Sequence, residues 1–398
     1  MSKKIITSCI KLLCVILICT IFTGCAAKNT NNINIDDQPY WNVFNHYITK
    51  GENGYYFISH NYLYFMQDNG KGIILCNNAS CIHDSEECLA YLSINYNSQQ
   101  LYYYNNKLYV MYNDFKESNS CYLIEIAADG SERKRLFEIG EASVKYGLTF
   151  HDNCVYIYTR QGGVSGFKEN TATIRARSLD GKKDKIIHSY TGMGATIYAL
   201  KSYGDKMYFL QEEQIRDEKN QSASAVFKRQ GLYSYDYNKN KIEKEFDGEL
   251  CDYAIDIDNH IIYYYVYNDG LYKKDLSKGD AEKLYEYEDG QTNICQVSCD
   301  SSYVYLSNEM FYAAYHLNPK EYDLYVLDKS GKLLNTIPTD AALCTYFGDD
   351  IYMFSSGHER EDEQEKFRYI KKSEILSAKK WTYVDWIQYK QDNLKTRN

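Results

Sequence analysis

Four side chains that commonly bind metal lie within one short segment of this chain. They are Cys76, Cys81, His83 and Cys88, with the spacing C-x4-C-x-H-x4-C. Three thiols and one imidazole can complete a tetrahedral site, because thiolate sulfur and neutral imidazole nitrogen are suitable ligands for Zn²⁺. The spacing differs from that of standard zinc fingers. The segment is therefore a candidate Zn²⁺ site of unusual spacing.

A disulfide is the competing interpretation of the same residues. Outside the cytoplasm, a bridge from Cys76 to Cys81 or to Cys88 would also close this loop. Free thiols are the third possibility. Nine cysteines follow Cys25, and because nine is odd, at least one of them must stay reduced, bind metal or pair with another chain.

No catalytic motif accompanies this cluster. The sequence contains no G-x-S-x-G nucleophile elbow. Adjacent acids such as Glu212 and Glu213 lie in charged runs, which are ordinarily solvated. We therefore expect a protein that is not an enzyme. The alternative is an extracytoplasmic hydrolase or lyase whose active-site residues lie far apart in the sequence and meet at the mouth of a central channel.

The N-terminus has the features of an export signal. Lys3, Lys4 and Lys11 precede an apolar run from Leu12 to Phe22, and Thr23, Gly24 and Cys25 follow this run. The run has about 11 residues, whereas a membrane-spanning helix needs about 20. The end of the run resembles the lipobox of bacterial lipoprotein signals, with Phe22 where these signals usually have leucine. We predict a signal peptide over residues 1–24 and lipidation of Cys25.

Residues 25–40 are polar and rich in asparagine, which predicts a flexible tether. The whole chain has a net charge of −9. An acidic surface repels phosphate backbones, so nucleic acid is not an expected partner. The expected partners are the cell membrane, through the lipid anchor, and an unidentified protein, peptide or glycan ligand.

A repeated pattern covers the rest of the chain. A tight turn followed by a tyrosine-rich strand recurs at intervals of roughly 40 to 55 residues, an interval typical of propeller blades. The seven copies have their turns at Gly54, Asn106, Asn153, Asp205, Asn259, Ser302 and Asp350. A second turn follows in most copies, as in Asp129-Gly130 and Asp180-Gly181. The last copy, which leads to Trp381–Val384, is degenerate.

Two hairpins per repeat predict four-stranded antiparallel sheets that bury their faces against one another. We therefore expect an all-β fold over residues 41–398, a seven-bladed β-propeller of four-stranded blades. The 43 tyrosines are expected to fill the spaces between sheets. The Cys/His cluster would then lie where the chain crosses from the first repeat to the second.

The signal, the tyrosine-rich repeats and the cluster together resemble uncharacterised β-propeller lipoproteins of Gram-positive anaerobic bacteria. Those proteins share a domain of unknown function, and we expect their propeller to be of the YWTD, LDL-receptor-like type. The resemblance covers nearly the whole chain from about Tyr55. It implies a similar Cys/His cluster and a location at the outer face of the cell membrane, but no substrate.

The expected function is that of a membrane-anchored binding or scaffold module. A metal sensor or carrier that uses the Cys/His cluster is a further alternative. Sequence alone does not choose between these functions, because propellers carry their ligand sites on loops that vary from protein to protein.

Replacing Cys25 by alanine should release the protein into the medium or leave an unprocessed precursor, because the acyl chains supply the membrane attachment. Cell fractionation and intact mass spectrometry measure both outcomes. Unchanged fractionation together with an unchanged mass would contradict lipidation at Cys25.

Overall fold

The computed structural model describes residues 48–386, except for 60, 68–70, 84–86, 94, 161–168, 217–224, 267–268, 278–279, 287–293, 309–321, 340–342, 348–350 and 357–365. The chain divides into two units, Met1–Asn34 and Ile35–Asn398, and all described residues belong to the second. The predicted signal peptide, Cys25 and the tether lie outside the described residues.

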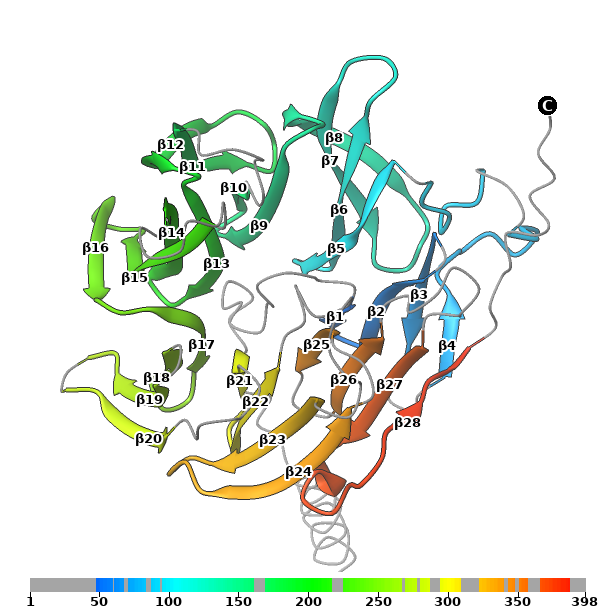
Figure 1. Ribbon diagram of the computed structural model, residues 1–398. Helices are drawn as coiled ribbons and strands as arrows, with labels where there is room; N and C mark the ends of the chain where they lie inside the picture. The colour runs from blue at the N-terminus through cyan, green and yellow to red at the C-terminus, as the bar shows by residue number, and fades with distance from the viewer. Residues whose placement is uncertain are drawn as a thin grey trace, which may run out of the picture. The chain divides into compact units, whose positions relative to one another are not determined.

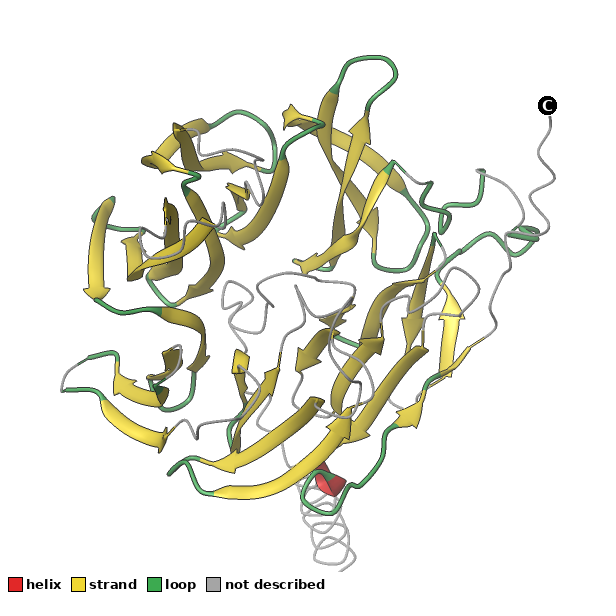
Figure 2. Ribbon diagram, viewed as in Figure 1, coloured by secondary structure: helices red, strands yellow, loops and turns green. Residues whose placement is uncertain are grey.

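The described chain is almost entirely β-strand (Figure 2). We number the sheets in the order of their first strands. Sheet 1 comprises β1 (Ile48–Gly51), β2 (Gly54–Ser59), β3 (Tyr62–Met66), β4 (Lys71–Ile74) and β29 (Asp385–Trp386). Sheet 2 comprises β5 (Tyr96–Tyr104), β6 (Lys107–Asp114), β7 (Ser120–Ala127) and β8 (Arg133–Glu141). Sheet 3 comprises β9 (Lys145–His151), β10 (Cys154–Arg160), β11 (Glu169–Ser178) and β12 (Asp184–Met193).

The remaining sheets follow the same order along the chain. Sheet 4 comprises β13 (Thr196–Tyr203), β14 (Lys206–Arg216), β15 (Ala225–Asp236) and β16 (Lys241–Phe246). Sheet 5 comprises β17 (Leu250–Asp256), β18 (Ile261–Val266), β19 (Gly270–Asp275) and β20 (Glu282–Glu286). Sheet 6 comprises β21 (Ile294–Cys299), β22 (Tyr303–Asn308), β23 (Tyr322–Asp328) and β24 (Leu333–Thr339). Sheet 7 comprises β25 (Leu343–Phe347), β26 (Ile351–Ser356), β27 (Lys366–Lys371) and β28 (Thr382–Tyr383), with a short 3-10 helix, η3 (Lys372–Glu374), after β27.

The predicted turns lie where the hairpins of these sheets require them. Six of the seven predicted turns lead into the second strand of a sheet, and the seventh, at Asp350, lies outside the described residues. At the second hairpins, the carboxylates of Asp129, Asp180 and Asp328 each accept a hydrogen bond from the backbone N–H two residues further on, at 2.9–3.0 Å. Such side-chain to backbone bonds stabilise tight turns. The all-β propeller with hairpin-built sheets is therefore confirmed.

The prediction of seven four-stranded antiparallel blades is wrong. The structure has six blades of that form, sheets 2–7. Sheet 1 differs because a fifth strand, β29, lies parallel to β4, with Asp385 opposite Lys71. The physical reason is that β28 has only two residues, so the chain leaves sheet 7 early and pairs with the open edge of β4.

The first strands are the most deeply buried. All residues of β13 and of β17 are buried, whereas the fourth strands β12 and β16 have no buried residue. Figure 1 shows the first strands on the inner side of the sheets, where β1 contacts β5, β9 contacts β13 and β17 contacts β21. Burial on both faces explains why β13 and β17 are mainly apolar, while the edge strand β16 carries lysine and glutamate.

Aromatic rings fill several spaces between neighbouring sheets, as the tyrosine content predicts. Tyr56 of sheet 1 stacks on Tyr103 of sheet 2 with ring centroids 5.8 Å apart. Tyr104 of sheet 2 stacks on Phe150 of sheet 3 at 5.1 Å. Such pairs contribute about 0.5–1.5 kcal/mol beyond the burial of their surface. Packing between sheets therefore supplies much of the stability of the fold.

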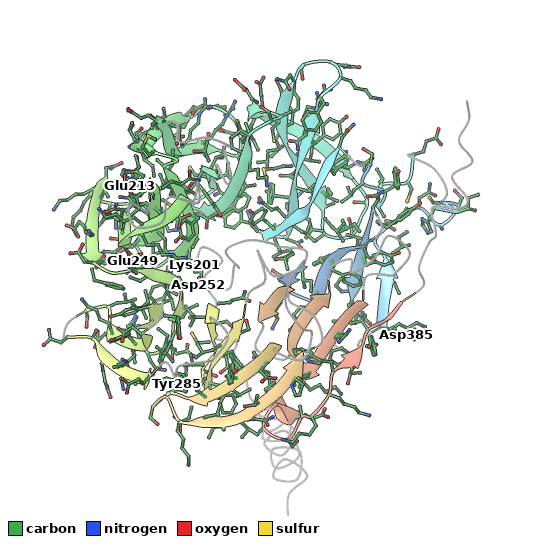
Figure 3. All side chains as sticks on the ribbon, viewed as in Figure 1. Lys201, Glu213, Glu249, Asp252, Tyr285 and Asp385 are labelled. Carbon is green, nitrogen blue, oxygen red and sulfur yellow. The ribbon has the colours of Figure 1, made fainter. Side chains whose placement is uncertain are left out.

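Buried ion pairs join the later sheets. Lys201 of β13 lies 3.5 Å from Asp252 of β17, with both side chains almost completely buried (Figure 3). Lys329 of sheet 6 pairs with Asp256 of sheet 5 at 2.8 Å. Lys372 of η3 lies 3.3 Å from Asp300, which follows β21. These pairs fix sheets 4 to 7 against one another, because removing the lysine leaves a buried carboxylate without its counter-ion.

Replacing Lys201 by methionine should lower the free energy of unfolding by about 3–5 kcal/mol, because the Asp252 carboxylate remains buried without its cation. Burial already raises the pKa of the Asp252 carboxyl. A raised pKa in the folded state favours folding at low pH and disfavours it as the pH rises. The loss of unfolding free energy in Lys201→Met should therefore become smaller as the pH is lowered toward about 4, the ordinary pKa of an aspartate in the unfolded chain.

Equilibrium urea unfolding at several pH values measures this loss. Lys182→Met is the matched control, because Lys182 pairs with Asp180 at an exposed turn, at 3.0 Å. The control should leave the unfolding midpoint unchanged. Equal midpoints for Lys201→Met and the control would contradict a structural role for the buried pair.

Candidate metal centre

The Cys/His cluster lies on the crossing segment, which we define as residues 75–95 between β4 and β5, without residues 84–86 and 94. Backbone hydrogen bonds attach both ends of this segment to sheet 1. Leu63 of β3 accepts from Leu75 N–H at 2.8 Å and donates to Ala90 O at 2.9 Å. These bonds bring the two ends of the segment together and leave the residues between them to close a loop.

The start of the crossing segment also contacts the β7–β8 turn of sheet 2. Asn77 N–H donates to Gly130 O at 3.4 Å. Gly130 has a positive φ of 72°, and a Cβ at this position would lie 2.6 Å from Leu75 O. Glycine is therefore required here both by the backbone conformation and by the close approach of the segment.

All four side chains expected to form the site lie together. One ligand atom from each of Cys76, Cys81, His83 and Cys88 lies within 4.8 Å of the other three. A tetrahedral Zn²⁺ ion with bonds of about 2.0–2.3 Å has ligand atoms about 3.3–3.8 Å apart. His83 Nδ1 and Cys88 Sγ are already 3.3 Å apart. Small side-chain rotations would bring the remaining atoms to coordination distance, so these residues fit a Zn²⁺ ion.

Local contacts hold the histidine in place. His83 has a positive φ of 57°, a conformation uncommon for residues other than glycine. Its carbonyl oxygen accepts a hydrogen bond of 2.7 Å from the hydroxyl of Tyr62 on β3. The neighbouring Ile82 is exposed, so the backbone turns the imidazole inward and the apolar side chain outward. Sequence analysis did not identify Tyr62, because its only signal is a tyrosine in a chain rich in tyrosine.

Burial and hydrogen bonding shift the pKa of the Cys76 thiol in opposite directions. Burial raises the pKa of Cys76, but hydrogen bonds from the Asn78 backbone and the other two thiols outweigh it, so the pKa is lower than usual. Cys88 is 1% exposed, and burial raises its pKa to about 12. Burial lowers the pKa of His83. The cluster thus combines one thiol of lowered pKa, one thiol of raised pKa and an imidazole whose lowered pKa favours the neutral form that metals bind.

Cys76, Cys81 and Cys88 are not disulfide-bonded in the structure. Cys88 belongs to the hydrophobic core around sheet 1, and Cys76 and Cys81 pack against that core. The cluster therefore closes the crossing segment over apolar side chains. Within the described ranges, no other group of His, Cys, Asp and Glu side chains converges in the same way.

Other cysteines have different environments. Cys121 and Cys299 are buried in the core. Cys154 is partly buried against the core of sheets 3 and 4. The side chains of Cys295 and Cys344 are outside the described part of the chain.

Comparisons with known proteins identify no family for this chain. No protein-family model matches the chain, and no curated protein matches it. A putative 6-phosphogluconolactonase from Bacteroides uniformis has a TM-score of 0.47 and 11% identity, over 86% of this chain and 96% of its own. BamB from Moraxella catarrhalis has a TM-score of 0.40 and 11% identity, over 78% of this chain and 92% of its own. An uncharacterized protein from Listeria monocytogenes has a TM-score of 0.40 and 12% identity, over 70% and 79%.

These similarities are too low to assign a function, and the propeller assignment depends on the strand pairing described above. A search of the described residues for helices long and apolar enough to cross a membrane finds none.

Replacing Cys81 by serine should loosen the part of the crossing segment between Asn77 and Glu87 and leave the sheets folded, because no described apolar side chain in that part is buried. We expect proteolytic cleavage between Cys76 and Tyr91 to become at least about tenfold faster, which corresponds to about 1.4 kcal/mol of local stability. The cleavage rate and the urea midpoint are measured together.

Ser80→Ala is the matched control, because Ser80 is exposed on the same segment and its hydroxyl donates to Asn78 Oδ1, at 2.8 Å. It should not change the cleavage rate. Equal rates in wild type, Cys81→Ser and Ser80→Ala would show that the cluster does not stabilise the segment.

Proposed function

We propose that this chain is a membrane-anchored extracytoplasmic lipoprotein whose propeller is a binding or scaffold module, and that its Cys/His cluster holds Zn²⁺ as a structural ion. The observation that carries this proposal is the convergence of four protein ligand atoms within 4.8 Å of one another. Three sulfurs and one nitrogen form a ligand set that suits Zn²⁺. Mg²⁺ and Ca²⁺ bind oxygen ligands instead.

The number of protein ligands favours a structural ion over a catalytic one. Catalytic zinc sites usually have three protein ligands and keep the fourth position for water or substrate. Here Cys76, Cys81, His83 and Cys88 would fill all four positions. A Zn²⁺ ion at this site would stabilise the crossing segment, which supports a binding module over a zinc-dependent hydrolase.

The buried carboxylates also favour a binding module over a hydrolase or lyase. An acid–base site needs carboxyl groups that face one another or a substrate. Asp252, Asp256 and Asp300 instead each lie within 3.5 Å of a lysine ammonium from a neighbouring sheet. In the described part of the chain, these acids therefore have structural partners that account for their burial.

The proposed location depends on the N-terminal sequence. A lipidated Cys25 would carry enough buried methylene groups for stable attachment, at about 0.8 kcal/mol each. A flexible tether over residues 25–40 would have an average span of roughly 20 Å. That span would leave the propeller beside the membrane, with its surface accessible to a protein, peptide or glycan ligand.

Metal analysis of the full-length chain, purified in detergent without added metal, tests the proposed ion. We expect one Zn²⁺ per chain in the wild type and at least a tenfold lower content in Cys81→Ser and in His83→Ala. A disulfide would not depend on His83, so the histidine variant separates the two interpretations.

Cys154→Ser is the matched control, because this thiol lies on β10, outside the cluster, and is also partly buried. It should retain the full metal content. A wild-type chain without zinc, with a bridge between any two of Cys76, Cys81 and Cys88 in its mass spectrum, would contradict the proposal.

A further inference from the structure

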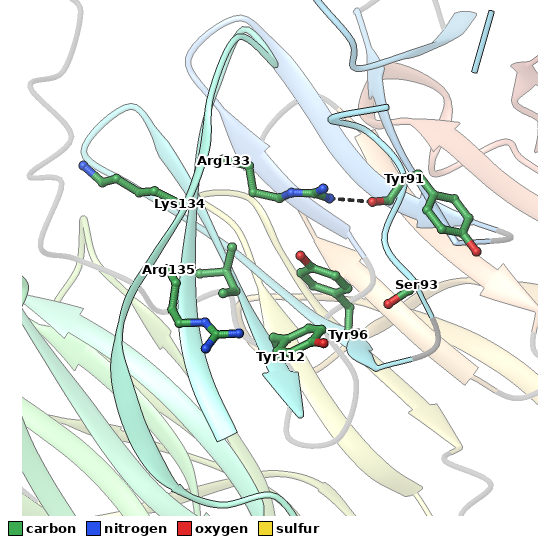
Figure 4. A pocket seen from close by; sticks show the side chains of 8 residues that line it. Tyr91, Ser93, Tyr96, Tyr112, Arg133, Lys134 and Arg135 are labelled. Carbon is green, nitrogen blue, oxygen red and sulfur yellow. Dashed lines mark hydrogen bonds between the residues drawn. The ribbon is translucent and has the colours of Figure 1, made fainter. Parts of the chain in front are cut away.

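A pocket of about 300 Å³ lies between the crossing segment and one face of sheet 2 (Figure 4). Tyr91 and Ser93 form the wall on the side of the segment, directly after Cys88. The side of sheet 2 is lined by Tyr96, Tyr112, Ile124, Arg133, Lys134 and Arg135. The pocket is therefore assembled from two parts of the chain that the Cys/His cluster and its backbone hydrogen bonds hold together.

The tyrosines present an aromatic surface. Tyr96 and Tyr112 lie opposite each other on β5 and β6, with ring centroids 4.9 Å apart in an edge-on arrangement. Neither side chain is fully buried. A pocket with aromatic faces and hydroxyl groups, including that of Ser93, suits a ligand with both C–H surfaces and hydroxyls.

Two arginines supply positive charge in a protein of net charge −9. Arg133 donates a hydrogen bond of 2.5 Å to Tyr91 O, and its guanidinium lies 5.4 Å from the Tyr96 ring centroid. The guanidinium of Arg135 lies 4.0 Å from the Tyr122 ring and 5.6 Å from the Tyr112 ring. In the described part of the chain, neither arginine has a carboxylate oxygen within 4.0 Å; Asp114 is the carboxylate that Arg135 influences from further away.

The intervening Lys134 has a different environment. Its ammonium pairs with Glu125 at 3.0 Å, and Figure 4 shows its side chain directed away from those of Arg133 and Arg135. This alternation follows from the two-residue period of β8. Arg133 is used to hold Tyr91, so Arg135 is the cation whose hydrogen-bond donors are available to a ligand.

We propose that this pocket binds a sugar-sized organic anion, with the guanidinium of Arg135 holding its oxyanion and the tyrosine rings contacting its ring carbons. A guanidinium forms paired hydrogen bonds with carboxylate and phosphate alike. The ligand class is therefore an acidic sugar or a sugar phosphate. This inference deepens the proposed binding function and rests on it.

Calorimetric titration of the full-length chain in detergent, at low salt and pH 7, tests the ligand class. The probes are glucuronate, glucose 6-phosphate, uncharged glucose and acetate. We expect glucuronate or glucose 6-phosphate to bind at least tenfold more tightly than glucose and acetate, and the tighter of the two identifies the oxyanion. Equal binding of glucose would overturn the role of the charge, and equal binding of acetate would overturn the role of the sugar ring.

Arg135→Gln should weaken binding of the preferred anion by about tenfold or more, since a hydrogen bond to a charged group is lost. Arg135→Lys keeps the charge without the paired donors and should give a smaller loss. Lys182→Gln, at an exposed turn outside the pocket, is the control and should bind as the wild type does. Unchanged affinity in Arg135→Gln, with an unchanged urea midpoint, would overturn the proposal.

Measuring anion binding with and without a zinc chelator distinguishes a failure of the pocket proposal from a failure of the metal proposal. If Zn²⁺ holds the crossing segment, chelation should weaken anion binding in the wild type, because Tyr91 and Ser93 lose their support. Unchanged binding after chelation, together with a loss in Arg135→Gln, would count against the structural ion while supporting the pocket. Loss on chelation without any effect of Arg135→Gln would support the ion and overturn the pocket.

Discussion

Burial of sheet faces against neighbouring sheets is the constraint on which the rest of this structure depends. A four-stranded antiparallel sheet has two faces, and the first strands β13 and β17 are buried at every position. Stacked aromatic rings and buried lysine–carboxylate pairs occupy the contacts between sheets. Because each sheet needs its neighbours for burial, the segments that cross between sheets are held at both ends.

The crossing segment between sheets 1 and 2 is held at its ends by the sheets, and its middle carries the Cys/His cluster. Its ends are fixed by hydrogen bonds to Leu63 and by the contact of Asn77 with Gly130. The middle of the segment has no strand to hold it, and the Cys/His cluster lies there. The same segment continues into Tyr91, whose carbonyl oxygen accepts from Arg133 of sheet 2. The cluster, the segment and the pocket are thus consecutive parts of one stretch of chain.

Much of the fold follows from the sequence, for identifiable reasons. Hairpins depend on local residues, so the turn motifs at Asn106, Asn153 and the equivalent positions locate the second strands of the sheets correctly. The strand β29 was not predicted, because two residues carry no periodicity. Its parallel pairing with β4 also joins residues that lie far apart in the sequence, Asp385 and Lys71. This is why the count of four-stranded blades is six and not seven.

The candidate site was predictable only in part. The cluster is local, so its spacing identifies Cys76, Cys81, His83 and Cys88 as one group. The contacts that orient it are not local: Tyr62 lies on β3, and Gly130 lies in a turn of sheet 2. The arginines of the pocket are likewise brought to Tyr91 by the packing of sheets, and a run of Arg133, Lys134 and Arg135 in the sequence resembles any other charged strand.

In the structure that we propose, a zinc ion with three sulfur ligands and one nitrogen ligand would hold the crossing segment in place. X-ray absorption spectroscopy at the zinc edge of the purified full-length chain tests this claim most directly. The account predicts three sulfur atoms at about 2.3 Å and one nitrogen atom at about 2.0–2.1 Å from the metal. A spectrum with only oxygen and nitrogen ligands, or a chain that takes up no zinc, would contradict it.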